Sequence, residues 1–490
     1  MHAQPQMQRT KTSAFLTLVS VFFFWGFVAA SNDILIPVFK EKLHLEQWQS
    51  QMISFCFYVA YTIGAIIYTI GSKITKGDLL NSIGYKNGIA LGLTISAAGT
   101  LLFYPAANNA SFPLMLTGLF IVGLGFSLQQ TAANPLAIVI GDPKTGAQRL
   151  SMTGGVNNFG TTIGPLIVSY AIFGDLDGSA AVASIESVKT PYLVLGVAFL
   201  LAAILFKFSS LPNKIPTVSE TSESSSSGGR KSALSYPQLW LGMIGIFVYV
   251  GVEVSTASNM PDFMKQHLTG ANGEPFPTEK IAPFVSLYWA SLMIGRWTGA
   301  VGAFGVEGLT KKVLNFLMPY IAFSVFLLVN LIAKHEVSQF YIYSLVIIVM
   351  IIGDLLSKGN PARQLLIFSL MGITALVIGM LSSGMVSVFA FASVGLFCST
   401  LWPCIFTLAV SGLGKHTNEG SGYLIMMIMG GGIISVLQGI LADSFLGIQY
   451  SFIAGVACFA YLAFYAIRSK KILQAQGIDF DSVTTTGAGH

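Results

Sequence analysis

Three ionisable side chains lie inside long apolar stretches of the sequence: Asp33, Glu253 and Arg296. A charge at the centre of a bilayer costs at least about 2.5–3.5 kcal/mol, so such residues usually face a partner or a water-filled pathway. A carboxyl group held away from water keeps its proton more tightly, which suits proton exchange near neutral pH. We therefore predict a proton-coupling role for Asp33 and Glu253, with Arg296 as a counter-charge that keeps its proton. The structural alternative is a fixed ion pair that holds helices together.

Uncharged polar and aromatic side chains gather on a few of the same stretches. Amides donate and accept hydrogen bonds, as a polyhydroxy ligand requires, although in lipid they can equally bond to neighbouring helices. Aromatic rings can stack on the apolar face of a sugar, and Pro403 is expected to kink the helix beside Trp402. Gln129 and Gln130 lie about 100° apart on a helix and cannot share one face. The predicted substrate-binding residues are Asn32, Tyr58, Tyr61, Gln129, Gln130, Asn134, Asn157, Asn158, Asn259, Trp402 and Gln438.

The composition predicts that the elements carrying these residues are membrane-spanning helices. Of 490 residues, 53% are hydrophobic and only 10% are charged, whereas soluble domains average about 25% charged residues. The apolar residues fall into runs of about 20, the length of a membrane-spanning helix, and an open strand edge in lipid would leave backbone groups unpaired. Fourteen spans are predicted: 13–39, 48–71, 86–107, 112–140, 151–174, 190–206, 237–264, 282–304, 313–333, 338–357, 362–382, 385–410, 420–442 and 449–467.

The basic residues test this count and orient the chain. If both termini are cytoplasmic, the cytoplasmic segments hold 19 of the 26 Lys and Arg residues, the outer segments hold six, and Arg296 lies within a span. This asymmetry follows the positive-inside rule, and a wrong span count would mix the two groups. No stretch gathers enough basic residues for a phosphate-binding face, so nucleic acid is excluded as a partner.

Residues 211–236 interrupt the apolar pattern and divide the chain. The stretch SETSESSSSGGRKS is polar and is expected to be a flexible cytoplasmic linker. It separates an N-terminal six-helix bundle (1–210) from a C-terminal bundle (237–470), which a cytoplasmic tail (471–490) follows. Glycine-rich segments recur at corresponding places, GGVNNFGTTIGP in the fifth span and GGGIISVLQG in the thirteenth. Paired glycines let helix backbones approach closely, and two such halves predict a transporter with its site between them.

The sequence contains no recognisable catalytic or nucleotide-binding motif. The four cysteines lie in apolar runs without metal-ligand spacing, and the six histidines fall in predicted loops or tails. No loop has the Walker pattern that cradles phosphates. We expect no metal, no cofactor and no enzymatic activity, and we expect transport to draw on a solute or ion gradient.

Five motifs, in order, resemble those of the fucose–galactose–glucose–proton symporters of the major facilitator superfamily. They are SNDILIP, LQQTAANP, YVGVEVS, IGRWTG and GYLIMMIMGGGI, and the resemblance covers residues 13–470. It implies two rocking six-helix bundles, a central sugar site and coupling through acidic residues, the first matching Asp33. The fucose carrier has a second carboxylate where this chain has Gln130, so the glucose and galactose members are more similar. Either Glu253 then takes the second coupling role, or coupling rests on Asp33 alone.

The superfamily normally has twelve spans, so two of the fourteen require an explanation. Residues 359–372 resemble the usual ninth span, which makes residues 313–357 an added two-helix hairpin, expected at the periphery.

The sequence thus predicts a monomeric, multi-pass protein of the bacterial inner membrane. It is expected to take up a monosaccharide together with protons by alternating access, and the monosaccharide is either a hexose such as glucose or galactose or an amino sugar. The alternatives are sodium-coupled or uncoupled transport, and a membrane sugar sensor that does not transport.

Overall fold

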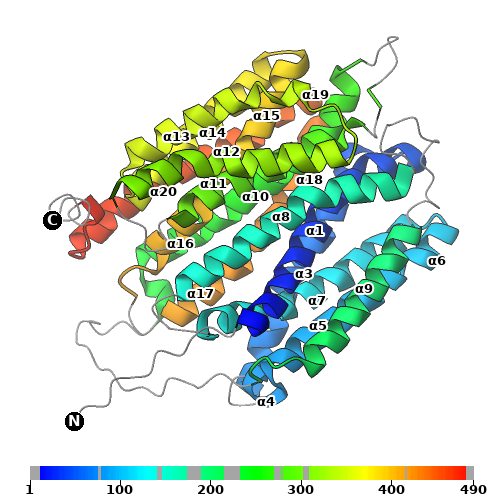
Figure 1. The fold of residues 1–490 in the computed structure, drawn as a ribbon, viewed down its shortest axis with the longest axis horizontal. Coiled ribbons are helices and arrows are strands. Elements are labelled where there is room, and N and C mark those ends of the chain that lie inside the picture. Colours follow the sequence, from blue (N-terminus) through cyan, green and yellow to red (C-terminus); the bar gives the residue numbers. More distant parts are fainter. Residues whose placement is uncertain are drawn as a thin grey trace.

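The computed structural model describes residues 12–74, 79–140, 146–173, 189–213, 232–269, 276–277, 280–301, 308–413 and 417–481. Its regular structure is helical, as predicted, and most helices run side by side along the long axis of the molecule (Figure 1). The first half contains α1 (Thr12–Leu43), α2 (Gln47–Ser50), α3 (Met52–Ile74), α4 (Leu79–Ile83), α5 (Tyr85–Leu101), α6 (Phe103–Asn108), α7 (Phe112–Val139), α8 (Gly146–Phe173) and α9 (Lys189–Phe208).

The second half begins after the predicted linker with a short 3₁₀ turn, η3. It contains η3 (Ala233–Ser235), α10 (Pro237–His267), α11 (Ala282–Ala300), α12 (Gly308–Ile332), η6 (Ser338–Phe340), α13 (Tyr343–Ser357), α14 (Pro361–Leu381), α15 (Gly384–Cys398), α16 (Leu401–Val410), α17 (Thr417–Met426), η8 (Met427–Met429), α18 (Gly430–Asp443), α19 (Gly447–Ser451) and α20 (Ile453–Ala475).

Twelve helical segments in the described part of the chain are long and apolar enough to cross a bilayer. Every predicted span coincides with a helix or a broken helix pair, but α8 and α11 are not among these twelve. Polar residues explain the difference for α8, which carries two asparagines and three threonines within its predicted span. The helix pair α15–α16 is interrupted between Cys398 and Leu401. This agrees with the expected kink, because Pro403 cannot donate a backbone hydrogen bond to Ser399.

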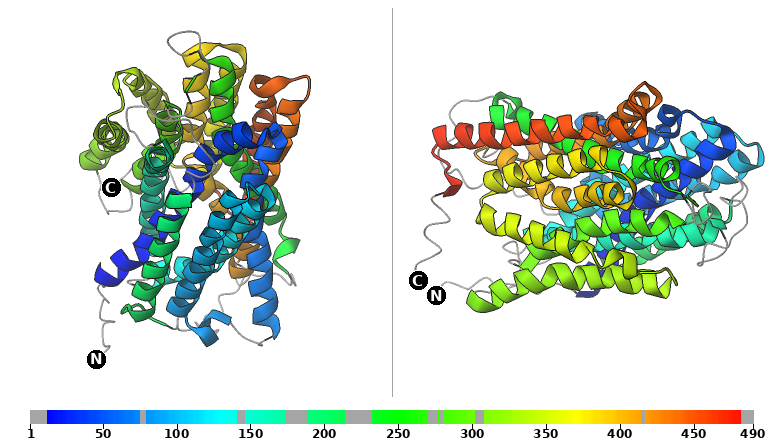
Figure 2. Two further views of the ribbon diagram at one scale, coloured as in Figure 1. Left: turned by 90° about the vertical axis from the view of Figure 1, so that its right-hand side faces the viewer. Right: turned by 90° about the horizontal axis from the view of Figure 1, so that it is seen from above.

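The helix pairings of the first half recur in the second half. In the first half α1 packs on α8, α3 on α7, and α5 on both α7 and α9. In the second half α10 packs on α18, α11 on α15, and α14 on both α15 and α20. The order of these pairings is the same once α12 and α13 are set aside. The predicted repeat is therefore visible as repeated packing, and the α12–α13 hairpin lies outside it, with α12 at the edge of the molecule (Figure 2).

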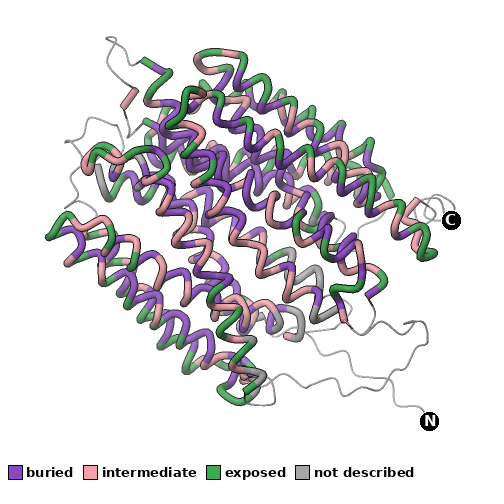
Figure 3. Tube along the Cα trace, turned by 180° about the vertical axis from the view of Figure 1, so that it is seen from behind, coloured by how far each residue is buried: buried purple, intermediate pink, exposed green. Residues whose placement is uncertain are grey.

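The two halves meet mainly along two pairs of long helices, α8 with α11 and α3 with α18. Buried residues concentrate where helices face one another, and exposed residues lie on the outer surface (Figure 3). That outer surface carries many large apolar side chains, including Ile67, Leu201 and Leu355. A surface of this kind is stable only in hydrocarbon, which agrees with the membrane location.

Close backbone contact explains the glycines predicted to pack helices. A Cβ atom on Gly432 of α18 would lie 2.7 Å from Phe55 Cα of α3, so only glycine allows this approach between the halves. In the first half, a Cβ atom on Gly160 of α8 would lie 2.3 Å from the backbone oxygen of Phe23 in α1. The two glycine-rich segments therefore set how closely the helices around the centre of the molecule approach.

Candidate functional site

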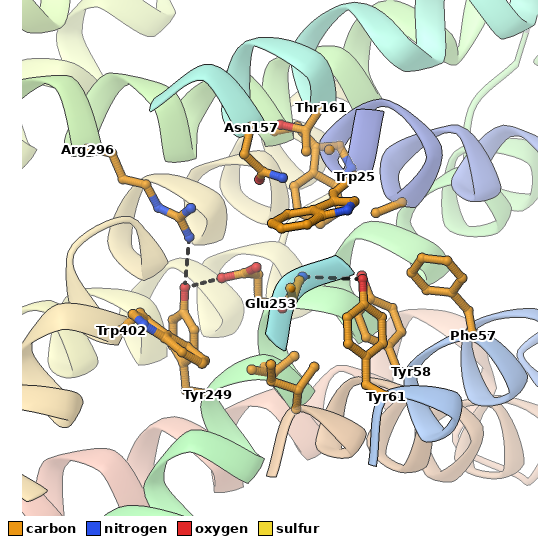
Figure 4. Close-up of a pocket in the computed structure, with 16 residues that line it drawn as sticks. Trp25, Phe57, Tyr58, Tyr61, Asn157, Thr161, Tyr249, Glu253, Arg296 and Trp402 are labelled. Atoms are coloured by element: carbon orange, nitrogen blue, oxygen red, sulfur yellow. Dashed lines mark hydrogen bonds between the residues drawn. The ribbon is translucent and has the colours of Figure 1, made fainter. Parts of the chain in front are cut away.

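A cavity of about 150 Å³ lies between the two halves, and both contribute to its walls (Figure 4). Helices α1, α3, α7 and α8 line it from the first half, and α10, α11, α16 and η8 line it from the second. The hairpin α12–α13 contributes none of the lining residues. These are Trp25, Gly26, Ala29, Phe57, Tyr58, Tyr61, Gln130, Asn157, Thr161, Tyr249, Val250, Glu253, Trp289, Arg296, Trp402 and Ile428.

On the second half, a carboxylate, a phenol and a guanidinium form a chain of hydrogen bonds. Tyr249 donates to Glu253, one helical turn further along α10, and Arg296 Nη2 of α11 donates to Tyr249 Oη at 3.5 Å. Spacing of four residues places Tyr249 and Glu253 on one helix face. The Tyr249 hydroxyl therefore links the acidic and basic groups, and the Trp402 ring lies 6.1 Å from the Tyr249 ring.

Arg296 also reaches the first half of the molecule. Its Nη1 atom donates to Asn158 Oδ1 of α8 at 3.1 Å. Nearby, Ser286 of α11 donates to the backbone oxygen of Thr162 at 2.7 Å. The guanidinium therefore bridges α8 and α11, where the two halves pack together, and it also faces the cavity.

On the first half, the cavity is lined by aromatic rings and amides. Tyr58 and Tyr61 lie three residues apart on α3 with their rings nearly parallel, 6.3 Å between centroids. Gln130 Nε2 of α7 donates to Tyr61 Oη at 3.4 Å, and Asn157 Nδ2 donates to the backbone oxygen of Phe22 at 3.0 Å. These flat rings and amide groups offer stacking surfaces and hydrogen bonds to a small polar molecule.

Asp33 lies behind the cavity wall. It is 2% exposed and accepts a hydrogen bond from Trp289 Nε1 at 2.8 Å. Asp33 is in α1 of the first half and Trp289 is in α11 of the second, and the Trp289 ring lines the cavity. A single indole therefore connects the buried carboxylate to the cavity across the boundary between the halves. Within the described residues, neither Asp33 nor Glu253 forms an ion pair.

The cavity brings together seven of the residues singled out from the sequence. They are Tyr58, Tyr61, Gln130, Asn157, Glu253, Arg296 and Trp402. The expected separation of the two adjacent glutamines is confirmed. Gln130 faces the cavity, whereas Gln129 is buried and accepts from Trp25 Nε1 at 3.0 Å. Gln129 therefore orients a cavity residue instead of lining the cavity itself.

The other predicted binding residues lie elsewhere. Asn259 is buried beside Gln47, which donates to it at 2.8 Å. Gln438 donates to Ser451 Oγ at 3.4 Å. Asn134 is half-buried and is not part of the cavity lining, and the side chain of Asn32 lies outside the described residues. A ligand-binding role for Asn259 and Gln438 has no support from this cavity, because neither residue lines it.

Four cavity residues with hydrogen-bonding side chains were missed in the sequence: Trp25, Thr161, Tyr249 and Trp289. Helical spacing could have found three of them. Thr161 and Tyr249 each lie four residues from a predicted cavity residue, and Trp289 lies two turns before Arg296, on the same face of α11. Trp25 also lies two helical turns before a predicted residue, Asn32, but Asn32 is not among the cavity residues. Aromatic residues are common in membrane helices, so their type alone gave no signal.

The packing and the cavity agree with one family of membrane transporters. The model of the Major Facilitator Superfamily matches residues 14–333. The chain belongs to the major facilitator superfamily. It is therefore a membrane transporter and not an enzyme, as the sequence predicted.

Named relatives place the chain within this superfamily. It is 32% identical over 471 residues to the "Glucose/galactose transporter" of Brucella abortus, covering 96% of this chain and 97% of that one. It is 25% identical to the "L-fucose-proton symporter" of Escherichia coli, covering 92% of each chain. The crystal structure of the E. coli fucose–proton symporter superposes with a TM-score of 0.59, at 25% identity, over 94% of this chain and 99% of that one. The predicted resemblance to this branch, with glucose/galactose members more similar, is confirmed.

Proposed function

We propose that this major facilitator takes up a monosaccharide, a hexose such as glucose or galactose or an amino sugar, together with protons. The observation that carries the proposal is the cavity between the halves, where indole and phenol rings, amides and one carboxylate converge from both bundles. A ligand bound there touches both halves. Alternating access requires this arrangement, because one bundle rocks against the other around a fixed central site.

Sugar recognition is assigned to rings and amides of both halves. The rings of Trp25 and Trp402 can stack on the apolar face of a pyranose, while Gln130 and Asn157 bond its hydroxyl groups. A hydroxyl-bonding site discriminates strongly against analogues that lack the hydroxyl, because its buried polar groups are then left unpaired. The proposed ligand is therefore a small polyhydroxy compound, in agreement with the named relatives.

Proton coupling is assigned to Asp33 and Glu253. Asp33 accepts a hydrogen bond from the other half through Trp289, so protonation of Asp33 weakens a contact between the halves. Glu253 lies in the cavity wall, where protonation changes the charge that the ligand meets. Protonation of Asp33 thus acts on the interface between the halves, and protonation of Glu253 acts on the binding site. Symport requires both effects, because proton binding must be linked to ligand binding and to movement of the halves.

Alternation also requires contacts that close one end and then separate. At the end that carries α2, Lys40 Nζ of α1 lies 2.7 Å from Asp262 Oδ2 of α10, and Lys265 pairs with Glu41. The backbone N–H groups of Gln47 and Trp48, at the start of α2, donate to the Asp443 carboxylate of α18. Together these contacts, which we call the α2-end latch, join the two halves at this end of the molecule.

The topology follows from the same proposal. With both termini in the cytoplasm, the α2 end is outside and the latch closes the outer end. We count α8 and α11 as spans as well, because each packs against helices of the twelve apolar segments. Together they give the fourteen spans predicted from the sequence. The hairpin α12–α13 is then an addition to two six-helix bundles. The excess of basic residues on one side supports placement in a bacterial inner membrane, and we propose a monomer.

Uptake into vesicles tests the proposal. The purified protein would be placed in liposomes and offered a panel of labelled monosaccharides, with and without an imposed pH gradient. We expect accumulation of at least one hexose or amino sugar only with the inside alkaline, independent of sodium. Accumulation that follows a sodium gradient instead would indicate sodium-coupled transport. Entry that never exceeds the equilibrium concentration would indicate uncoupled transport.

A further inference from the structure

A second, larger hollow of about 620 Å³ lies between the α12–α13 hairpin and the second bundle, away from the central cavity. Its walls are α13, α14 and α15, which lie side by side (Figure 1). All three belong to the twelve apolar segments that can cross a bilayer. The hollow is therefore a groove surrounded by hydrocarbon.

The groove offers no free hydrogen-bonding group to a ligand. Its three hydroxyls are already bonded within the protein. Tyr343 Oη lies 2.7 Å from Ser291 Oγ, and Thr374 and Ser393 each bond a backbone carbonyl of their own helix. The other twelve lining side chains are aliphatic, aromatic or thioether groups. A polar occupant would lose its hydrogen bonds to water without replacement, so the walls select a hydrocarbon chain.

The position and length of the groove fit one leaflet of a bilayer. It begins at Ile342 and Val386, where α13 and α15 start, and extends to Val349 and Phe397. This start lies at the α2 end. Gln449 of α19, six residues after the latch residue Asp443, donates to the backbone oxygens of Met380 and Ser382 at the end of α14. Eleven residues along α15 rise about 16 Å, and half of the hydrocarbon core is about 15 Å.

We propose that this groove binds one acyl chain of a phospholipid from the leaflet at the α2 end. The chain enters between the start of α13 and the start of α15, and its terminal methyl group reaches the middle of the membrane near Phe397. The added hairpin thereby forms one wall of a lipid site that the repeated helix packing of the two bundles does not provide. This inference does not depend on the identity of the transported solute.

Depth-resolved photolabelling tests the site. The protein would be reconstituted in phosphatidylethanolamine vesicles containing a trace of phosphatidylethanolamine with a diazirine in one acyl chain, either near the headgroup or at the chain end. We expect the chain-end probe to label peptides around Val349 and Phe397, and the upper probe to label peptides around Ile342 and Val386. Labelling should exceed that of the lipid-facing side of α20.

Variants that fill the groove supply the control. Ala390 lines the groove, whereas Ala460 is exposed on α20 outside it. We expect Ala390→Trp to lower labelling of α13–α15 severalfold and Ala460→Trp to leave it unchanged. Val349→Trp, which fills the groove from α13, serves if Ala390→Trp does not fold. Equal labelling in a folded groove-filling variant and in wild type, or labelling of α13–α15 no stronger than that of α20, would overturn the proposal.

Discussion

The two carboxylates of the proposed coupling path have different partners. Asp33 accepts a hydrogen bond from Trp289 of the opposite half, whereas Glu253 accepts one from Tyr249 of its own helix. A change in the charge of Asp33 therefore acts directly on a contact between the halves. A change at Glu253 acts on the cavity and, through Tyr249, on Arg296. Single substitutions can separate these two effects.

Asp33→Asn tests the first effect. The amide oxygen of asparagine can still accept from Trp289, so the geometry is retained while the proton-binding group is removed. We expect gradient-driven accumulation to disappear while exchange of labelled for unlabelled sugar continues, both measured in vesicles. Asp354→Asn is the matched control, since this half-buried carboxylate bonds Gln364 outside the cavity. Undiminished accumulation by Asp33→Asn would remove Asp33 from proton coupling.

Tyr249→Phe tests the link between Glu253 and Arg296. Loss of a hydrogen bond to a charged group costs about 1.5–3 kcal/mol, and this substitution removes the hydroxyl that joins Glu253 to Arg296. We expect the pH profile of the initial uptake rate to be shifted relative to the wild-type profile. Tyr461→Phe, which loses a hydroxyl bonded to the backbone of Leu241 outside the cavity, is the control. An unshifted profile for Tyr249→Phe would make the link purely structural.

Helix contacts across the centre set how far the halves can close. Gly432 of α18 lies against α3, where a methyl group would be 2.7 Å from Phe55 Cα. The glycine-rich pattern in the sequence predicted close packing here, but not which helix is approached, because pairing across the halves depends on the whole fold. The same limit applied to Asn259 and Gln438, whose amide chemistry suggested ligand contacts although each bonds a neighbouring element.

Gly432→Ala should separate α3 from α18 and disfavour closure of the α2 end. We expect faster alkylation of a cysteine introduced at the α2-end latch, together with slower uptake. Gly422→Ala, in the preceding helix α17, is the control, since a Cβ atom there meets nothing within 4 Å. If alkylation rates for the two variants match, the Gly432 contact does not control closure.

The α2-end latch should not set the pH dependence of transport. The hydrogen bond from Lys265 holds the pKa of Glu41, which lies beyond the predicted span 13–39, below its ordinary value. A lowered pKa means that this ion pair is present above the ordinary carboxyl range and is lost only as pH falls through that lowered value. We expect Glu41→Gln to change the uptake rate but to keep the shape of its profile between pH 5 and pH 8. A flattened profile would place proton coupling at the latch.

At the scale of the whole molecule, the sequence predicted the helical class, the two halves and the peripheral hairpin. The length of the apolar runs and the unequal distribution of basic residues can be read along the chain without knowledge of the fold. The cavity was only half predicted. Charged residues within apolar runs stand out in the sequence, whereas Trp25 and Trp289 are two of 59 Phe, Tyr and Trp residues, and their type alone does not show which of them face a cavity. Residues from α1 and α11 meet because two bundles pack together, and no local pattern encodes that meeting.

The central claim is that sugar and protons cross together through the cavity between the halves. Its most direct measurement is the pH outside protein-containing liposomes, recorded in weak buffer when the transported sugar is added without any imposed gradient. The account predicts sugar-dependent alkalinisation of the outer medium, present in wild type and Asp354→Asn and absent in Asp33→Asn. Sugar entry by wild type without a change in outer pH would contradict it.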